Sequence, residues 1–259
     1  MPVETNRDRL RELLRRVRQE ETAPLGFGFH PAQEPPRPQL AVGAWITETH
    51  DRFDDAIATG IHFLVCSIAE NTAPSPSQQR PIPIIAAPQS DALTPLLTVQ
   101  HLLERGFDNI LLDLQHTEAA VLSPLQRQYS LSFPLNLPYE EYSGLKFLRG
   151  LAYVVQDTPS TTGPLSVELL MRLALLTQAL PAPLIYQSAR LRPEDLPALV
   201  GIGLTGILLP IHLDHTGLTA LKTMVDAVQQ LDPHLRHAVE ELHDSSVILP
   251  LKGLQGSDE

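Results

Sequence analysis

Cysteine and lysine are scarce in this chain, and their scarcity excludes several kinds of chemistry. Cys66 is the only cysteine among 259 residues, so no internal disulfide and no multi-cysteine metal site can form. Because no basic residue adjoins Cys66, we expect a small buried side chain there and not a nucleophile. Lysine occurs only at positions 146, 222 and 252, in expected helices and the C-terminal tail. We therefore expect no Schiff-base lysine and no pyridoxal phosphate.

Long apolar runs and an excess of positive charge are also missing. No apolar run reaches the roughly 18 residues that span a membrane, and no signal-peptide core is visible at the N-terminus. The net charge of −11 argues against nucleic acid as a partner. We expect a soluble cytoplasmic protein that binds a small-molecule ligand. A homo-oligomer is one possible assembly of it. Six arginines crowd the N-terminus and suit either a solvated helix face or a patch for an anion or partner: Arg7, Arg9, Arg11, Arg15, Arg16 and Arg18.

What the chain does contain is a repeated pattern of short, continuously apolar runs. Such runs are typical of strands buried on both faces by helices. Eight candidate strands occupy residues 40–47, 62–68, 82–88, 109–115, 129–136, 152–158, 183–189 and 206–212. The pattern predicts helices at 51–59, 91–105, 139–149, 166–180, 192–201 and 216–231, a loop at 69–81, and at most a short helix at 117–128. Four glycines that precede alternate strands are expected to end helices in the left-handed conformation: Gly60, Gly106, Gly150 and Gly203.

Eight strands with intervening helices predict a single-domain (β/α)₈ TIM barrel, with an open doubly wound sheet as the alternative. The barrel is expected at residues 39–243. Residues 1–38 would form an N-terminal helix and a proline-rich lead-in, and 244–259 a tail. The extra helix, capped by Thr5 or Asn6, carries an apolar stripe of Leu10, Leu13, Leu14 and Val17 that could close the barrel floor or pack on a second subunit.

Polar residues at the ends of these strands are the candidates for a site, because active sites of such barrels lie at the C-terminal strand ends. "DLQH" (113–116) and "HLDH" (212–215) each combine a carboxylate with imidazoles. We expect Asp113, His116 and His212 as acid–base residues, or Asp113, His116, His212 and His215 as ligands of one divalent metal. Substrate contacts are expected from Gln89, Asn136, Gln156 and Gln187. The alternative is that strand ends are polar simply because they meet solvent.

One of these stretches resembles a known family. "RGFDNILLDLQHTEA" (105–119) resembles the strand with an Asp/Glu-His pair in HpcH/HpaI-type aldolases, and "VGAWIT" (42–47) resembles their first strand. The resemblance implies a metal-dependent barrel that cleaves 2-keto acids, with Asp113 and His116 in the polar site. It covers about a tenth of the chain, the pair follows the fourth strand instead of an early one, and the family's downstream metal carboxylates have no match.

Phosphate and flavin ligands are not expected. The loops after strands seven and eight lack the glycine-rich turns that hold phosphate, and only Gly217, Arg190 or Arg192 offer donors there. "GIGLTG" (201–206) precedes a strand, so it is a helix end and not a dinucleotide loop. The leading hypothesis is a cytosolic, aldolase-like enzyme that acts on a small polar molecule by acid–base or metal-assisted lyase chemistry. The alternative is a degenerate, non-catalytic barrel that serves as a binding or assembly module.

Overall fold

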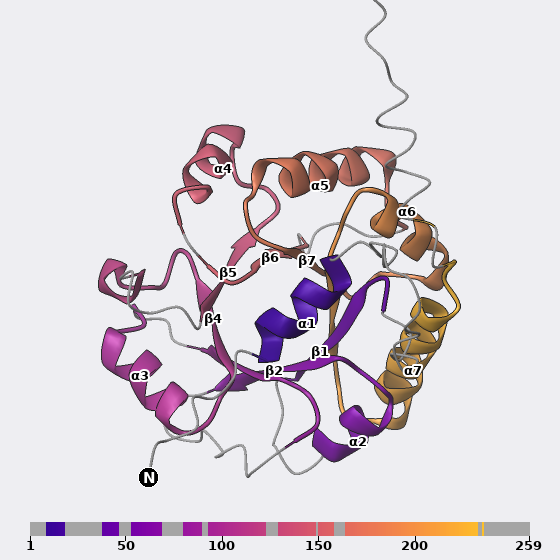
Figure 1. The fold of residues 1–259 in the computed structure, drawn as a ribbon, viewed down its shortest axis with the longest axis horizontal. Coiled ribbons are helices and arrows are strands. Elements are labelled where there is room, and N and C mark those ends of the chain that lie inside the picture. The colour runs from indigo at the N-terminus through magenta and orange to yellow at the C-terminus, as the bar shows by residue number, and fades with distance from the viewer. Residues whose placement is uncertain are drawn as a thin grey trace, which may run out of the picture.

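Eight parallel strands close into a barrel, as the apolar runs predict (Figure 1). The computed structural model describes residues 9–18, 38–46, 53–68, 80–89, 93–122, 129–148, 150–157, 164–232 and 235. Each strand pairs in parallel with the next one, and β8 returns to pair with β1. The strands are β1 (Ala41–Ile46), β2 (Phe63–Ile68), β3 (Ile84–Pro88), β4 (Asn109–Asp113), β5 (Tyr129–Pro134), β6 (Tyr153–Gln156), β7 (Leu184–Gln187) and β8 (Gly206–Ile211). The fold is therefore a (β/α)₈ TIM barrel.

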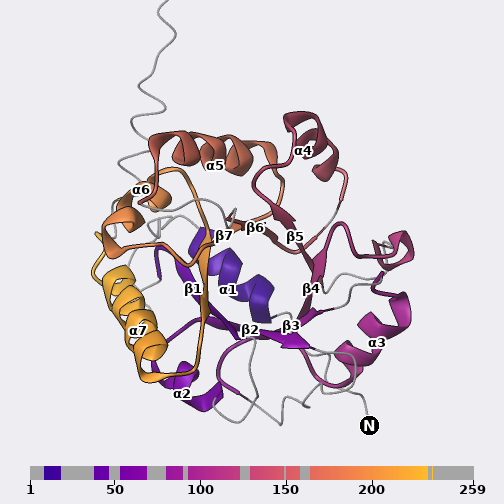
Figure 2. The same ribbon diagram turned by 180° about the vertical axis from the view of Figure 1, so that it is seen from behind.

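Helices surround the barrel on its outside (Figure 2). They are α2 (Phe53–Ala58), α3 (Leu96–Glu104), α4 (Tyr139–Leu145), α5 (Val167–Ala179), α6 (Leu196–Gly201) and α7 (His215–Gln229), with single 3-10 turns η2 (Ala119–Leu122) and η3 (Pro193–Asp195). All six overlap the predicted helices. At α3 the predicted helix began too early, because Pro95 is the N-cap and the helix starts after it. No described helix is long and apolar enough to cross a membrane.

The connection from β4 to β5 is the weakest part of the outer layer. Within residues 114–122 it contains only the single turn η2, in agreement with the prediction of at most a short helix. Residues 123–128 and most of the predicted loop at 69–81 lie outside the described part of the chain.

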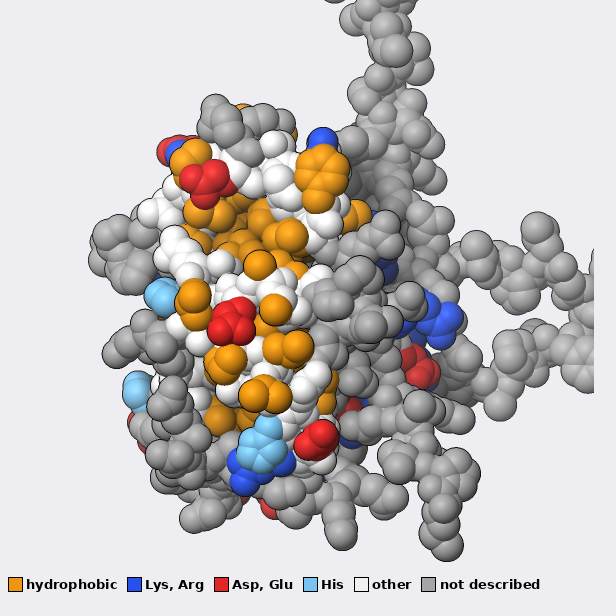
Figure 3. All heavy atoms as spheres, turned by 90° about the vertical axis from the view of Figure 1, so that its left-hand side faces the viewer, with side chains coloured by type: hydrophobic (Ala, Val, Ile, Leu, Met, Phe, Trp, Pro, Cys, Tyr) orange, Lys and Arg blue, Asp and Glu red, His pale blue; other side chains and the backbone are white. Residues whose placement is uncertain are grey.

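Hydrophobic side chains gather on the surface over α3 and α4 (Figure 3). Leu97 and Phe147 are each 76% exposed there.

Three of the four glycines predicted to end helices have the expected left-handed backbone. The φ angles of Gly60, Gly106 and Gly203 are 90°, 97° and 80°. Gly150 also lies just before its strand, β6. The positions of these glycines therefore predicted the alternation of helices and strands that the barrel shows.

The extra helix α1 (Arg9–Arg18) lies across the floor of the barrel, at the end where the strands begin (Figures 1 and 2). Its buried residues Leu10, Leu14 and Val17 belong to one apolar cluster with inward-facing strand residues such as Phe63 and Leu111. Polar contacts fix the start of the helix: the Arg9 guanidinium donates to the carbonyl oxygen of Arg80 at 2.6 Å and lies 3.7 Å from the Asp108 carboxylate. The prediction that this helix closes the floor is confirmed.

Cys66 points outward from β2 into the layer between barrel and helices and is fully buried. Burial raises the pKa of its thiol to about 12. The thiolate that a nucleophile requires is therefore absent at neutral pH, as the sequence predicted.

His62, just before β2, makes the stability of the barrel depend on pH. Its Nδ1 accepts a hydrogen bond from the backbone N–H of Val42 at 3.0 Å, and burial lowers the pKa of the ring below the ordinary value of 6.5. The unfolded chain then binds more protons than the folded chain, so this contribution is complete above pH 6.5 and is lost as the pH falls below it. The parent protein should have a higher free energy of unfolding, measured with urea, at pH 7.5 than at pH 5.5. We expect His62→Gln to show a smaller difference between these two pH values. An unchanged difference would contradict this role.

Candidate active site

A cavity of about 460 Å³ opens at the C-terminal ends of β1, β3, β4, β5 and β6. Four predicted site residues line it together: Gln89, Asp113, His116 and Gln156. Asp113 and Gln156 are last in their strands, and both continue the inward-facing series that includes Leu111 and Val154. Since side chains alternate along a strand, this register brings the two polar groups into the mouth. The remaining lining residues are Trp45, Ala87, Pro88, Thr94, Leu111 and Ser132.

Asp113 and His116 form a hydrogen-bonded pair at this mouth. Oδ1 of Asp113 lies 3.1 Å from Nδ1 of His116 and also accepts the backbone N–H groups of Gln115 at 2.8 Å and of His116 at 3.2 Å. The side chains are 37% and 51% exposed, respectively. One carboxylate oxygen therefore holds both the imidazole and the backbone of the turn that carries it. The geometry thus suits Asp113 as the group that orients His116 better than as a base.

The loop that carries His116 is attached to the loop before α3. The backbone N–H of Thr94 donates to the carbonyl oxygen of His116 at 2.8 Å, and the N–H of Glu118 donates to the carbonyl of Thr94 at 3.2 Å. Thr117 Oγ1 also donates to the carbonyl oxygen of Asp113 at 2.6 Å. These bonds hold the imidazole in place through its backbone, which a preorganised site requires.

Trp45 and Ser67 also lie at this mouth, although neither was among the residues expected to contact substrate. The indole Nε1–H of Trp45 donates to Ser67 Oγ at 2.8 Å, and Nε2 of Gln89 donates to the same oxygen at 3.0 Å. The bonds fix the indole and the amide of Gln89 relative to each other. The alternation along β1 and β2 carried a signal: Trp45 shares a face with Ala41, and Ser67 shares one with Phe63 and Val65.

Other predicted site residues lie away from this cavity. Gln187 pairs with Gln156 across β6 and β7, but it does not line the cavity. Asn136 is exposed in the turn after β5, and His212 and His215 are exposed at the start of α7. No group of three or more His, Cys, Asp or Glu among the described residues is placed to hold a metal ion. The predicted set of Asp113, His116, His212 and His215 therefore does not come together as metal ligands.

Two of the three donors that the sequence offered for a phosphate, Arg190 and Gly217, are engaged by other groups. Arg190 Nε lies 2.6 Å from the Asp157 carboxylate, to which Ser188 Oγ also donates at 2.8 Å; the arginine and aspartate are only 16% and 13% exposed. The backbone N–H of Gly217 donates to Asp214 Oδ1 at 2.7 Å. Neither of these two donors is therefore available to an anion at the mouth, and the lining of the cavity contains no lysine or arginine.

Comparison with known proteins supports the fold but assigns the chain to no family. No protein family matches the sequence, and no curated protein is significantly similar to it. Three solved structures that share its fold are thiamine phosphate pyrophosphorylase from Pyrococcus furiosus (TM-score 0.54, 11% identity), phosphoribosyl anthranilate isomerase from Thermus thermophilus (0.55, 15%) and tryptophan synthase alpha chain from Legionella pneumophila (0.54, 12%). Each match covers 74% of this chain, and 97%, 100% and 92% of the other chain, respectively. At these identities the likeness shows a shared TIM-barrel fold alone.

Proposed function

We propose that this barrel is an enzyme that acts on a small uncharged polar molecule by acid–base lyase chemistry, with His116 as the base. The observation that carries the proposal is the Asp113–His116 pair inside a cavity that also presents amides, hydroxyls and an indole. A carboxylate that accepts the Nδ1–H of an imidazole selects the tautomer whose Nε2 is free to take a proton.

In the proposed reaction, Nε2 of His116 removes a proton from a substrate hydroxyl or from a carbon next to a carbonyl. The electron pair released cleaves a C–C or C–O bond, and the imidazolium returns its proton to the product. The Gln89 and Gln156 amides, which line the same cavity, would donate to the oxygen on which negative charge develops, whereas the Ser132 hydroxyl donates to the carbonyl oxygen of Leu112 at 3.3 Å. Trp45 offers an apolar face to the carbon skeleton.

The charge of the cavity separates this proposal from the resemblance to HpcH/HpaI-type aldolases. A 2-keto acid needs a cation for its carboxylate, whereas the cavity lining holds the Asp113 carboxylate and no lysine or arginine. An uncharged polyhydroxy compound or hydroxycarbonyl compound meets its hydrogen-bonding needs from amides, hydroxyls and imidazole. We therefore expect such compounds to bind more tightly than keto acids.

A non-catalytic binding barrel is the second candidate. The bonds from the backbone of Gln115 and His116 to Asp113 give the carboxylate a structural role that needs no reaction. In that case the cavity would bind the same class of ligand without converting it.

The test combines ligand binding with turnover. Hydroxycarbonyl compounds, neutral polyols and keto acids would be screened by thermal shift, and the binders incubated with the protein and followed by NMR. We expect His116→Gln to keep ligand affinity within a few-fold and to lower turnover by roughly 10²–10⁴-fold, the usual contribution of a general base. His101→Gln, at an exposed position in α3, is the matched control and should leave both unchanged. Turnover that survives His116→Gln would refute the assignment, and binding without turnover would favour the second candidate.

A further inference from the structure

A second hollow of about 400 Å³ lies at the opposite end of the barrel from the mouth. It is bounded on one side by α1 and on the other by the segments that lead into β6 and β7, so it opens at the floor. The lining residues are Arg11, Leu14, Arg15, Arg18, Gly150, Leu151, Pro181, Ala182 and Pro183. None of them takes part in the site proposed above.

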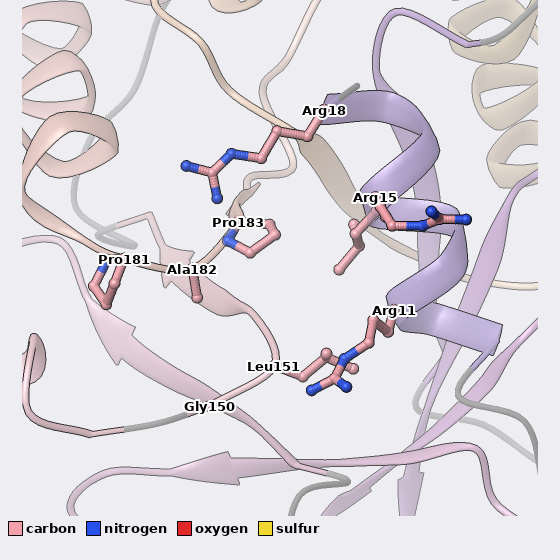
Figure 4. Close-up of a pocket in the computed structure, with 9 residues that line it drawn as sticks. Arg11, Arg15, Arg18, Gly150, Leu151, Pro181, Ala182 and Pro183 are labelled. Atoms are coloured by element: carbon pink, nitrogen blue, oxygen red, sulfur yellow. The ribbon is translucent and has the colours of Figure 1, made fainter. Parts of the chain in front are cut away.

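Three arginines give this hollow a positive wall on a chain whose net charge is −11. Arg11, Arg15 and Arg18 occupy positions i, i+4 and i+7 of α1 and so share one face of the helix. Figure 4 shows the Arg11 side chain directed toward Leu151 and the Arg18 side chain directed toward Pro183, on the two sides of the hollow, while Arg15 points away. No carboxylate among the described residues pairs with Arg18, in contrast to Arg16, which pairs with Glu12.

The other walls are apolar. Leu14 and Leu151 belong to the apolar cluster of the barrel interior, and Pro181, Ala182 and Pro183 form the far side. Both prolines lack a backbone N–H, so hydrogen-bond donation in this hollow falls mainly to the guanidinium groups. A ligand that fits must carry negative groups for the arginines and an apolar body for the prolines and leucines.

The spacing along α1 indicates more than one negative group. Arg11 and Arg18 are seven residues apart, which is about 10 Å along a helix axis. Cations near a helix C-terminus also stabilise the helix dipole, which explains basic residues in the last turn. That effect does not account for the apolar hollow that Arg11 faces from the first half of α1.

We propose that the barrel floor binds a small organic anion with two or more negative groups on an apolar body, held by Arg11 and Arg18. This site is independent of the proposed catalytic mouth. It would place a ligand against the helix that closes the barrel, and so couple ligand binding to the stability of the fold.

The probe is naphthalene-2,6-disulfonate, measured by titration calorimetry on the full chain and compared with naphthalene-2-sulfonate and inorganic sulfate. We expect the disulfonate to bind more tightly than either comparison compound and to weaken as NaCl rises from 50 to 300 mM. Arg18→Gln should lower its affinity roughly tenfold, the loss expected for one charge-assisted contact. Arg16→Gln, which makes the same change of charge on another face of α1, should change the affinity by less than about twofold.

Three results would overturn the proposal. Equal losses for Arg18→Gln and Arg16→Gln would show only a general charge effect. Sulfate that binds as tightly as the disulfonate would remove the role of the apolar walls, and no disulfonate binding at millimolar concentration would remove the site. The readout does not involve His116, so the outcome is separate from that of the proposed reaction.

Discussion

Replacing Gly43 by alanine is expected to lower the free energy of unfolding by about 3 kcal/mol, because the barrel interior has no room for one more methyl group. A Cβ atom at Gly43 would lie 2.2 Å from Cε2 and 2.3 Å from Cζ of the Phe63 ring. The two residues are paired on β1 and β2, and Phe63 is fully buried. The ring cannot move without disturbing the apolar cluster beneath α1. Urea or thermal unfolding measures the loss.

Gly144 provides the matched control for this substitution. It lies in α4, and a Cβ atom there would meet nothing within 4 Å. Alanine is favoured over glycine within a helix by up to about 1 kcal/mol, so Gly144→Ala should stabilise the protein. Combining Gly43→Ala with Phe63→Leu should recover part of the lost stability, since the smaller side chain makes room. If the two alanine variants had equal stability, Phe63 would not be the obstacle that the structure indicates.

The barrel was predictable because its signal is spread over the whole chain. Strands buried on both faces require continuous apolar runs, and every run from 40–47 to 206–212 became a strand. Glycines such as Gly60 and Gly203 marked the turn from helix to strand because the left-handed conformation disfavours other residues. Neither signal depends on knowing which residues meet in space.

The candidate site was only partly predictable because a polar strand end does not say where its side chain points. Within a strand the two-residue period indicates the face of a side chain, and Asp113 and Gln156, on the inward face, line the cavity. His212 follows the last residue of β8, where that period no longer applies, and its side chain is exposed. The histidine-rich stretch before α7 thus supplied a composition typical of a site without the geometry of one.

Trp45 and Ser67 were not among the expected substrate contacts because they lie within apolar runs. Both strands are continuous apolar runs, in which the two-residue alternation indicates the face of each side chain but does not show that the side chain binds a ligand. Only the closed barrel brings the indole of β1, the hydroxyl of β2 and the Gln89 amide after β3 into one hydrogen-bonded group. Contacts between neighbouring strands of this kind depend on register, which short parallel strands do not encode locally.

Truncating Leu10 to alanine is expected to cost about 3 kcal/mol in unfolding free energy, although the residue belongs to a helix outside the (β/α)₈ repeat. Leu10 is fully buried in the apolar cluster of the barrel interior, so its removal leaves a cavity between α1 and the strands. It does not line the hollow that holds Arg11 and Arg18, so the loss reports on the closed floor and not on the anion site.

Leu97→Ala is the control for this truncation. The same side-chain atoms are removed from α3, where Leu97 is 76% exposed, and the unfolding free energy should change by no more than about 0.5 kcal/mol. Equal effects of the two substitutions would mean that α1 does not enter the barrel in solution. A loss confined to Leu10→Ala, with ligand binding at the mouth retained below the unfolding temperature, would show that the helix supplies stability and that binding at the opposite end of the barrel does not depend on Leu10.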